Sequence, residues 1–176
     1  MILMRIIWLV LRVHAVYPNV PIDHVIVAVR AAVKAETSSA SAPLLVAIAQ
    51  HESDLRPRAV SWRRGRRRVD RVVDNPVEIP ARGPLACGLA SSIAADRATC
   101  ERLLDPTAAM LAAVAELTEE LARCRGDVSC ALSCYAGGRR GIDAWRAGLR
   151  TDATVFAAIF KRRAELLGAR FARPAS

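Results

Sequence analysis

The stretch from Leu103 to Gly126 constrains the fold most, because it carries a complete set of helix-boundary signals. Asp105 is a suitable N-cap, Pro106 fits the first helical turn, and Gly126 is a typical stop. Between these signals, apolar residues recur at helical spacing: Met110, Val114, Leu117 and Leu121. The segment therefore predicts a long helix that packs one face against a core.

Similar patterns predict further helices over about 22–36, 43–54, 128–135 and 153–171. Pro43 fits a first helical turn, and Pro57 disfavours helix in the residue before it. From 60 to 82 the pattern changes, and Arg64 and Gly65 lie between two stretches that could pair as a hairpin. We expect a mainly helical (α+β) fold with a short β-hairpin or loop insertion after the 43–54 helix.

The 176 residues suit one domain, which we place at 21–176, with 1–20 as a separate N-terminal segment. In that segment Arg5 and Arg12 bracket only the stretch 6–11. This stretch is shorter than a normal signal core and far below the roughly 20 residues of a membrane span. Three interpretations fit the segment 1–20: an extra amphipathic helix, a weak signal sequence, or a mis-assigned start.

The five cysteines all lie between residues 87 and 134 and lack the C-x2-C pairs and partner histidines typical of zinc sites. In an oxidising compartment their short spacings would suit two disulfides across loops. We pair Cys87 with Cys100 and Cys124 with Cys130, which leaves Cys134 free. In a reducing compartment all five would instead be small buried apolar residues.

The formal net charge of +9 favours a polyanionic partner, which nucleic acid, anionic lipid and bacterial wall polymers all satisfy. Charge is densest in "WRRGRRRVDR", where Trp62 could stack on a base. The same run could instead be a solvated loop that meets anionic wall polymers, through Arg63, Arg64, Arg66, Arg67 and Arg68.

Glu52 falls on the apolar stripe of the 43–54 helix, three and four residues after Ala49 and Ile48 and three before Leu55. A carboxyl group desolvated there has its pKa raised, so it can hold a proton near neutral pH and donate it to a leaving group. A structural glutamate paired with an arginine would fit the same position. The neighbouring residues favour the catalytic interpretation.

The segment "IAQHESDLRPRAVS" resembles the first motif of the soluble-type lytic transglycosylases, relatives of goose-type lysozyme that cut bacterial peptidoglycan. Glu52 and Ser53 match the family's Glu-Ser pair. Pro57, Ala59 and Ser61 match the proline and the A-x-S sequence that come after this pair in the family.

Three later segments resemble further family motifs in the family's order. "GPLACGLASS" matches at Gly88 and Leu89, "LLDPTAAMLAAVAEL" at Asp105, Pro106 and Leu117, and "ALSCYAGG" at Ala131, Leu132, Tyr135 and Gly138. Three polar positions differ from the family: Ser91 replaces a glutamine, and Ala109 and Ala136 replace asparagines. Each loss could cost about 1–3 kcal/mol if a sugar group goes unpaired, which would slow an enzyme or leave only glycan binding.

The resemblance implies a lysozyme-like fold and cleavage of the MurNAc–GlcNAc β-1,4 bond, with Glu52 catalytic and Tyr135 reaching toward it. Ser53, Gly88, Leu89, Ser91 and Gly138 would bind substrate. The product would carry a 1,6-anhydro-MurNAc end. Hydrolysis would need a second carboxylate, for which Asp54, Asp70, Asp74 and Glu78 are candidates.

The same resemblance implies an extracytoplasmic protein, in the periplasm, secreted, or carried on a phage or secretion apparatus. We expect a monomer that acts on peptidoglycan glycan strands and needs no metal or organic cofactor. The alternatives are a catalytically degenerate glycan-binding relative and, less favoured, a basic nucleic-acid-binding protein.

Overall fold

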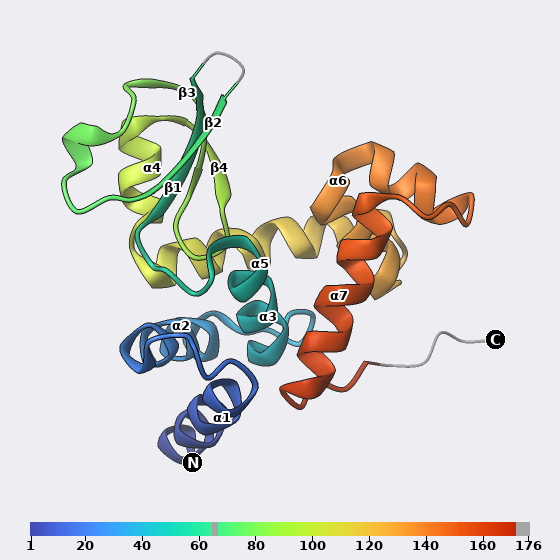
Figure 1. The fold of residues 1–176 in the computed structure, drawn as a ribbon. Helices are drawn as coiled ribbons and strands as arrows, with labels where there is room; N and C mark the ends of the chain where they lie inside the picture. Colours follow the sequence, from blue (N-terminus) through green and yellow to red (C-terminus); the bar gives the residue numbers. More distant parts are fainter. Residues whose placement is uncertain (65–66, 172–176) are drawn as a thin grey trace.

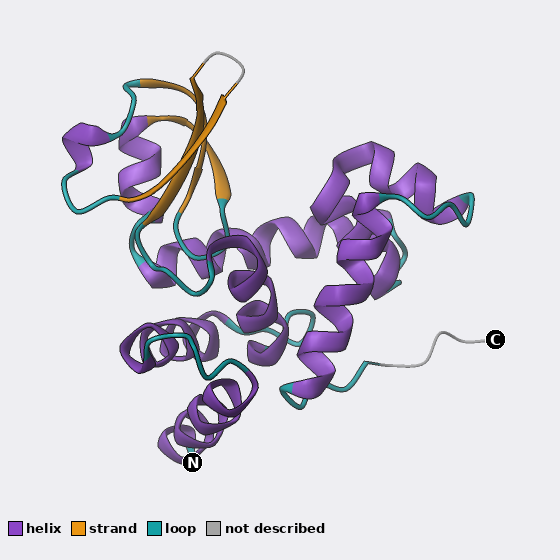
Figure 2. Cartoon of the chain, in the orientation of Figure 1, coloured by secondary structure: helices purple, strands orange, loops and turns teal. Residues whose placement is uncertain are grey.

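The structure, a computed structural model of the chain, describes residues 1–64 and 67–171. Helices predominate, and a small antiparallel sheet lies at one end (Figures 1 and 2). The helices are α1 (Ile2–Val16), α2 (Ile22–Ala35), α3 (Ala42–Ser53), α4 (Arg97–Leu103), α5 (Pro106–Arg123), α6 (Val128–Arg146) and α7 (Asp152–Leu166). The strands are β1 (Ala59–Arg64), β2 (Arg67–Val72), β3 (Arg82–Cys87) and β4 (Ser92–Asp96), with a short 3-10 helix η1 (Pro76–Glu78) between β2 and β3. This confirms the mainly helical, lysozyme-like α+β class.

Helix α3 is the centre of the main core, because nearly all of its side chains are apolar and buried. A helix that is apolar on all sides is stable only when neighbours surround it. Helices α2 and α7 pack against it, and α5 contacts its C-terminal half from the sheet side. The three predicted helices at 22–36, 43–54 and 105–126 are all present, and Asp105 caps α5 by accepting a hydrogen bond from the Ala108 N–H.

The predicted hairpin is present as β1 and β2, and its turn at 65–66 lies outside the described residues. The sheet has the order β2-β1-β3-β4, all antiparallel, and α4 packs against β3 and β4. A second small core lies between them, formed by Val60, Val73, Ile79, Leu85, Cys87, Ala94, Cys100 and Leu104. The insertion is thus larger than predicted, with four strands and a helix of its own.

The sequence missed one element and misjudged the extent of two others. No strand was predicted over 92–96, which forms β4, because its serine, alanine and aspartate residues give a weak strand signal. The helix expected at 128–135 is followed by a second helical stretch that reaches Arg146, and the two stretches, together labelled α6, meet at a kink where Gly138 has the non-helical angles φ 59°, ψ −149°. The last helix ends at Leu166 and not near 171. Gly168, just after this end, has the left-handed φ of +98° that is typical of a helix stop.

Both expected disulfides are present. Cys87–Cys100 joins β3 to α4, and Cys124–Cys130 joins the end of α5 to the start of α6. Cys134 is free and buried. Burial and the neighbouring Glu120 raise the pKa of its thiol to about 12, so it stays protonated at neutral pH.

The N-terminal segment forms α1, which packs against α2 and places Leu9 and Val13 in the main core. Arg5 forms an ion pair with Glu36, and the Arg12 guanidinium donates to the Leu166 carbonyl at 2.7 Å. Among the described helices, none combines the length and apolar character that a membrane crossing requires.

Candidate active site

Helix α3 ends directly after Glu52 and Ser53 through two consecutive residues with left-handed backbone. Asp54 has φ 52° and its N–H donates to the carbonyls of Ala49 and Gln50, while Leu55 has φ 60°. Left-handed backbone is uncommon for residues other than glycine, so surrounding structure must hold it. The Leu55 side chain is completely buried, which fixes this turn and thereby the position of Glu52.

The loop 88–91, between β3 and β4, is tied to the end of α3 and to α6 by three side-chain hydrogen bonds. The buried Ser53 hydroxyl lies 2.9 Å from the carbonyls of both Ala49 and Leu89. The Ser91 hydroxyl donates to the Glu52 carbonyl at 3.0 Å. The Tyr135 hydroxyl donates to the Ala90 carbonyl at 3.3 Å. Five residues of the expected site therefore meet at one loop: Glu52, Ser53, Leu89, Ser91 and Tyr135.

Gly88 allows this loop to approach α4. It has φ +73°, and a Cβ at this position would overlap the Leu103 carbonyl oxygen. Its N–H donates to the Ala59 carbonyl at 2.8 Å, and the adjacent Leu89 side chain is fully buried. The structure thus places Gly88 and Leu89 as packing residues that position the loop.

The Glu52 side chain is half-buried and lines a small hollow beneath the sheet. Burial raises the pKa of Glu52 above its usual value, Arg68 lowers it, and the Glu116 carboxylate raises it further. The enclosed part of the hollow measures about 20 Å³, which is room for about one water molecule. A sugar would therefore have to lie across this hollow and not inside it.

Asp70 and Arg68 share the hollow with Glu52. Arg68 donates to the Asp70 carboxylate at 2.8 Å, and Ser61 is the cross-strand partner of Asp70. Of the four carboxylates considered for hydrolysis, Asp70 is the one that lines this hollow. Asp54, although close in sequence, lines a different hollow beside the α1–α2 connection.

Tyr135 lies on α6, close enough to Glu52 and Glu116 for their charges to affect its hydroxyl. Burial raises the pKa of its hydroxyl well above the usual value, and Glu116 and Glu52 raise it further. The hydroxyl is therefore neutral at physiological pH and can act as a hydrogen-bond donor. Its ring packs edge-to-face with Phe160, with 6.4 Å between the ring centroids.

Glu116 of α5 is a neighbour that sequence reasoning missed. Desolvation raises its pKa, and Glu120 and Glu119, on the same helix, raise it further. The residue is outside the apolar stripe of α5, and although it lies within the segment "LLDPTAAMLAAVAEL" it is not one of that segment's matched positions, so no local pattern singles it out. Only the packing of α5 between α3 and α6 brings it near Glu52 and Tyr135.

The predicted arginine run does not form one continuous patch, because successive strand residues point to opposite faces of a sheet. Arg63 pairs with Arg68, and Arg64 pairs with Arg67. The first pair therefore shares the face of Ser61 and Asp70, and the second pair shares the opposite face with Trp62. Arg66 lies outside the described residues.

The remaining positions do not gather at the Glu52 hollow. Gly138 forms the kink of α6, and the lining of the hollow does not include it. Ala109 is fully buried and Ala136 packs against the main core. Larger hollows occur elsewhere, including one of about 650 Å³ between the α6–α7 connection and α7. Among the described residues no group of three or more His, Cys, Asp and Glu side chains is arranged to hold a metal ion.

A half-buried glutamate at the end of a central helix, beside a small antiparallel sheet, is the arrangement of a lysozyme-like protein. The transglycosylase SLT domain family matches residues 30–154, well over half of the chain. The chain belongs to this family, and the resemblance seen in its motifs is confirmed. Comparisons with curated proteins and with solved structures found no match. The family supports a glycan-cleaving enzyme of the transglycosylase type that acts on peptidoglycan.

Proposed function

We propose that this protein is a peptidoglycan lytic transglycosylase that cleaves the MurNAc–GlcNAc β-1,4 bond and uses Glu52 as its catalytic acid and base. The observation that carries the proposal is the position of Glu52. Its carboxyl group is half-buried at the end of α3, its pKa is raised by that burial, and it lines a hollow at the base of the sheet. A carboxyl group held in this way keeps its proton closer to neutral pH than an exposed one does.

In the proposed reaction, the protonated Glu52 carboxyl donates its proton to the glycosidic oxygen, and the bond from that oxygen to C1 of MurNAc breaks. GlcNAc leaves with a free 4-hydroxyl, and the substrate's acetamido group stabilises the positive charge at C1. The Glu52 carboxylate then takes the proton of the MurNAc 6-hydroxyl as its oxygen bonds to C1. This step forms the 1,6-anhydro ring and restores the protonated Glu52, so no water is consumed.

The other residues of the site position Glu52 and the glycan in this proposal. Ser53 and Ser91 fix the end of α3 to the loop 88–91, and Tyr135 holds the same loop from α6. The Tyr135 hydroxyl would turn from the Ala90 carbonyl toward the sugar or the Glu52 carboxyl when substrate binds. The motifs also predict that the loop 88–91 and Gly138 contact the glycan directly, and these contacts stay predictions.

The proposed partner is the peptidoglycan strand, in an extracytoplasmic compartment. The two disulfides support that location, because such bonds persist in oxidising compartments. Anionic wall polymers are a second proposed partner. A hollow of about 390 Å³ on the sheet supports this proposal, since Trp62 and several arginines line it, among them Arg64, Arg71 and Arg82.

The test is a digest of purified sacculi by the wild-type protein and by Glu52→Gln, with the products identified by mass spectrometry. The proposal expects anhydro-muropeptides from the wild type and a loss of at least about a thousandfold in Glu52→Gln, because an amide cannot donate the catalytic proton. Asp54→Asn is the matched control, since it alters a neighbouring carboxylate that lies outside the hollow. Binding to sacculi without products would favour the degenerate glycan-binding relative, and salt-sensitive nucleic-acid binding without wall affinity would favour the third hypothesis.

Hydrolysis is the second candidate reaction, and the position of Asp70 favours it. Its carboxylate lines the hollow of Glu52, where it could activate a water molecule. Hydrolysis would yield reducing-end MurNAc in place of the anhydro sugar. Asp70→Asn separates the reactions: a hydrolase loses most of its activity, whereas a lytic transglycosylase keeps its product.

A further inference from the structure

Helix α1 has an apolar face that the described parts of the chain leave uncovered. Its exposed residues recur at helical spacing: Leu3, Met4, Ile7, Trp8 and Leu11, which are 43–69% exposed. On the other side of the same helix, Leu9 and Val13 are buried in the main core. The helix is therefore held to the domain by one face and exposes a second, continuous apolar face.

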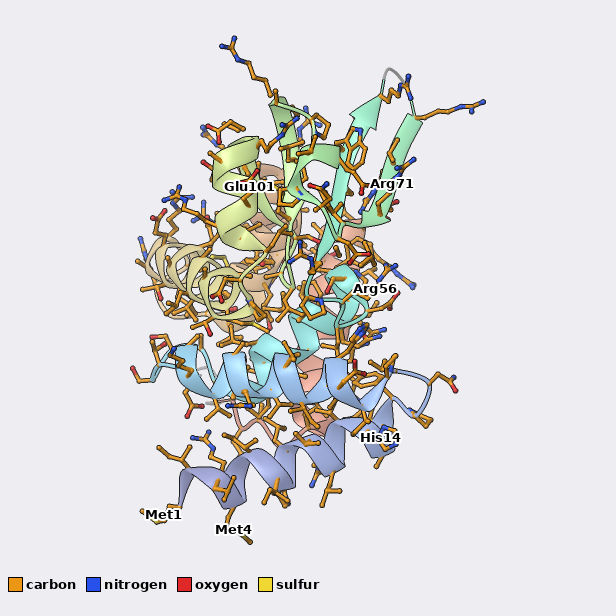
Figure 3. The ribbon with its side chains drawn as sticks, turned by 90° about the vertical axis from the view of Figure 1, so that its left-hand side faces the viewer. Met1, Met4, His14, Arg56, Arg71 and Glu101 are labelled. Atoms are coloured by element: carbon orange, nitrogen blue, oxygen red, sulfur yellow. A yellow bond between two sulfur atoms is a disulfide. The ribbon has the colours of Figure 1, made fainter. Side chains whose placement is uncertain are left out.

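This face lies at the end of the molecule remote from the sheet. In Figure 1, α1 is the outermost helix at the bottom, and the sheet is at the top. In Figure 3, turned by 90°, Met1 and Met4 point away from the body of the protein, and Arg71 of the sheet lies at the opposite end. Figure 1 also places the end of α3, which carries Glu52, on the sheet side of the molecule.

Cations accompany the apolar face, and α1 itself contains no acidic residue. A groove of about 590 Å³ runs between α1 and α2, with Ile2 and Ile6 among its apolar lining residues. Arg30 and Lys34 also line it, and neither forms an ion pair within the described residues. Arg12 lies over the Trp8 ring at 5.1 Å. Apolar side chains beside unpaired cations and an aromatic ring match the boundary between acyl chains and anionic head groups.

We propose that α1 docks the protein on an anionic lipid bilayer, with the helix lying in the plane of the membrane surface. Its 15 residues span about 22 Å, and the helix lacks the length and apolar character of a membrane crossing. A second copy of the chain is a poorer occupant of this face. Each copy carries a net charge of +9, and Arg30 and Lys34 of the two copies would repel each other. Lipid head groups instead supply the opposite charge.

Docking through α1 fixes the orientation of the proposed active site. Since Glu52 and the sheet lie toward the other end of the molecule, they would face away from the bilayer. A peptidoglycan layer above the membrane is on that side. The protein would then act from the membrane surface outward, with its catalytic end presented to the glycan.

The test is co-sedimentation of the full chain with lipid vesicles at low salt. We expect binding to vesicles that mix phosphatidylglycerol with phosphatidylcholine, and much weaker binding to pure phosphatidylcholine. The double variant Met4→Glu, Leu11→Glu should lose at least about tenfold in affinity, because it puts two anions into the apolar face. The control Val77→Glu, Leu149→Glu makes the same charge change at two exposed apolar residues outside α1 and should bind like the wild type.

Trp8 provides a second readout that does not depend on a charged variant. Its emission should shift to shorter wavelength on binding anionic vesicles, and Trp8→Phe should lose that shift although Trp62 and Trp145 remain. Equal binding by both double variants, equal affinity for pure phosphatidylcholine, or no binding would overturn the proposal. The proposal would also be overturned if the wild-type protein did not bind vesicles but self-associated, and the α1 double variant abolished that self-association. None of these results depends on the glycan reaction.

Discussion

Ser53→Ala tests whether the hydrogen bonds around the loop 88–91 hold the proposed site together. The Ser53 side chain is 2% exposed, and its single hydroxyl proton is shared between the carbonyls of Ala49 and Leu89, each at 2.9 Å. Alanine removes the hydroxyl donor, so the buried Leu89 carbonyl loses the hydrogen bond from Ser53. Such a loss costs about 2 kcal/mol, within a usual range of about 1–3 kcal/mol. In a protein of this size that lowers Tm by about 4–8 °C.

Ser133→Ala is the matched control. Ser133 is also buried, at 1% exposure, and also donates to a carbonyl four residues earlier, that of Ser129 at 2.8 Å. Unlike Ser53, it makes no hydrogen bond to another element in the described structure. Because that bond lies within one helix, its loss should cost less than about 1 kcal/mol.

The assay is thermal unfolding of both variants and the wild type, followed by circular dichroism, together with hydrogen exchange of the amides in 88–91. Ser53→Ala should be the less stable variant by about 1 kcal/mol or more and should exchange faster in the loop. Equal losses in the two variants, with unchanged loop exchange, would refute the argument that the Ser53–Leu89 bond positions this loop.

Three further predictions concern the same site. Arg68→Ala should raise the pKa of Glu52, because it removes the cation that lowers it, and the basic limb of the pH–rate profile should move to higher pH. Glu52→Gln should be more stable than the wild type at neutral pH. A carboxyl pKa that is raised in the folded state destabilises that state as pH rises above the unfolded value near 4.3, so the difference should vanish below about pH 4 in urea titrations. Gly88→Ala should be strongly destabilising in thermal melts, because its Cβ would overlap the Leu103 carbonyl oxygen, whereas Gly126→Ala, at φ +85° with nothing within 4 Å, should lose only about 1 kcal/mol.

The sequence predicted the helical core well because periodic apolar residues and boundary signals are local. Asp105, Pro106 and Gly126 bound α5 almost where the structure has it. The disulfides were also predictable, since short spacings bring cysteines of adjacent elements together. Strand β4 was not, because its pairing with β3 is a tertiary contact and its side chains have little strand preference.

In the candidate site, the motifs singled out Glu52 and Tyr135 but not their electrostatic neighbours. The matched motifs carry Glu52 and Tyr135 directly. Arg68 was predicted as a contact for wall polymers, yet the alternation of β2 turns it toward Glu52. Glu116 has no local signal, since its place beside Tyr135 depends on how α5 and α6 pack. Such neighbours result from the fold and not from spacing.

The raised pKa of Glu52 is the central claim, and a carboxyl ¹³C NMR titration of the folded protein measures it most directly. With Glu52→Gln used to assign the resonance, we predict a midpoint above that of an exposed glutamate, so that the Glu52 carboxyl keeps its proton to higher pH than an exposed glutamate does. A midpoint at or below the ordinary glutamate value would contradict the account, because Glu52 would then hold no proton to donate to the glycosidic oxygen.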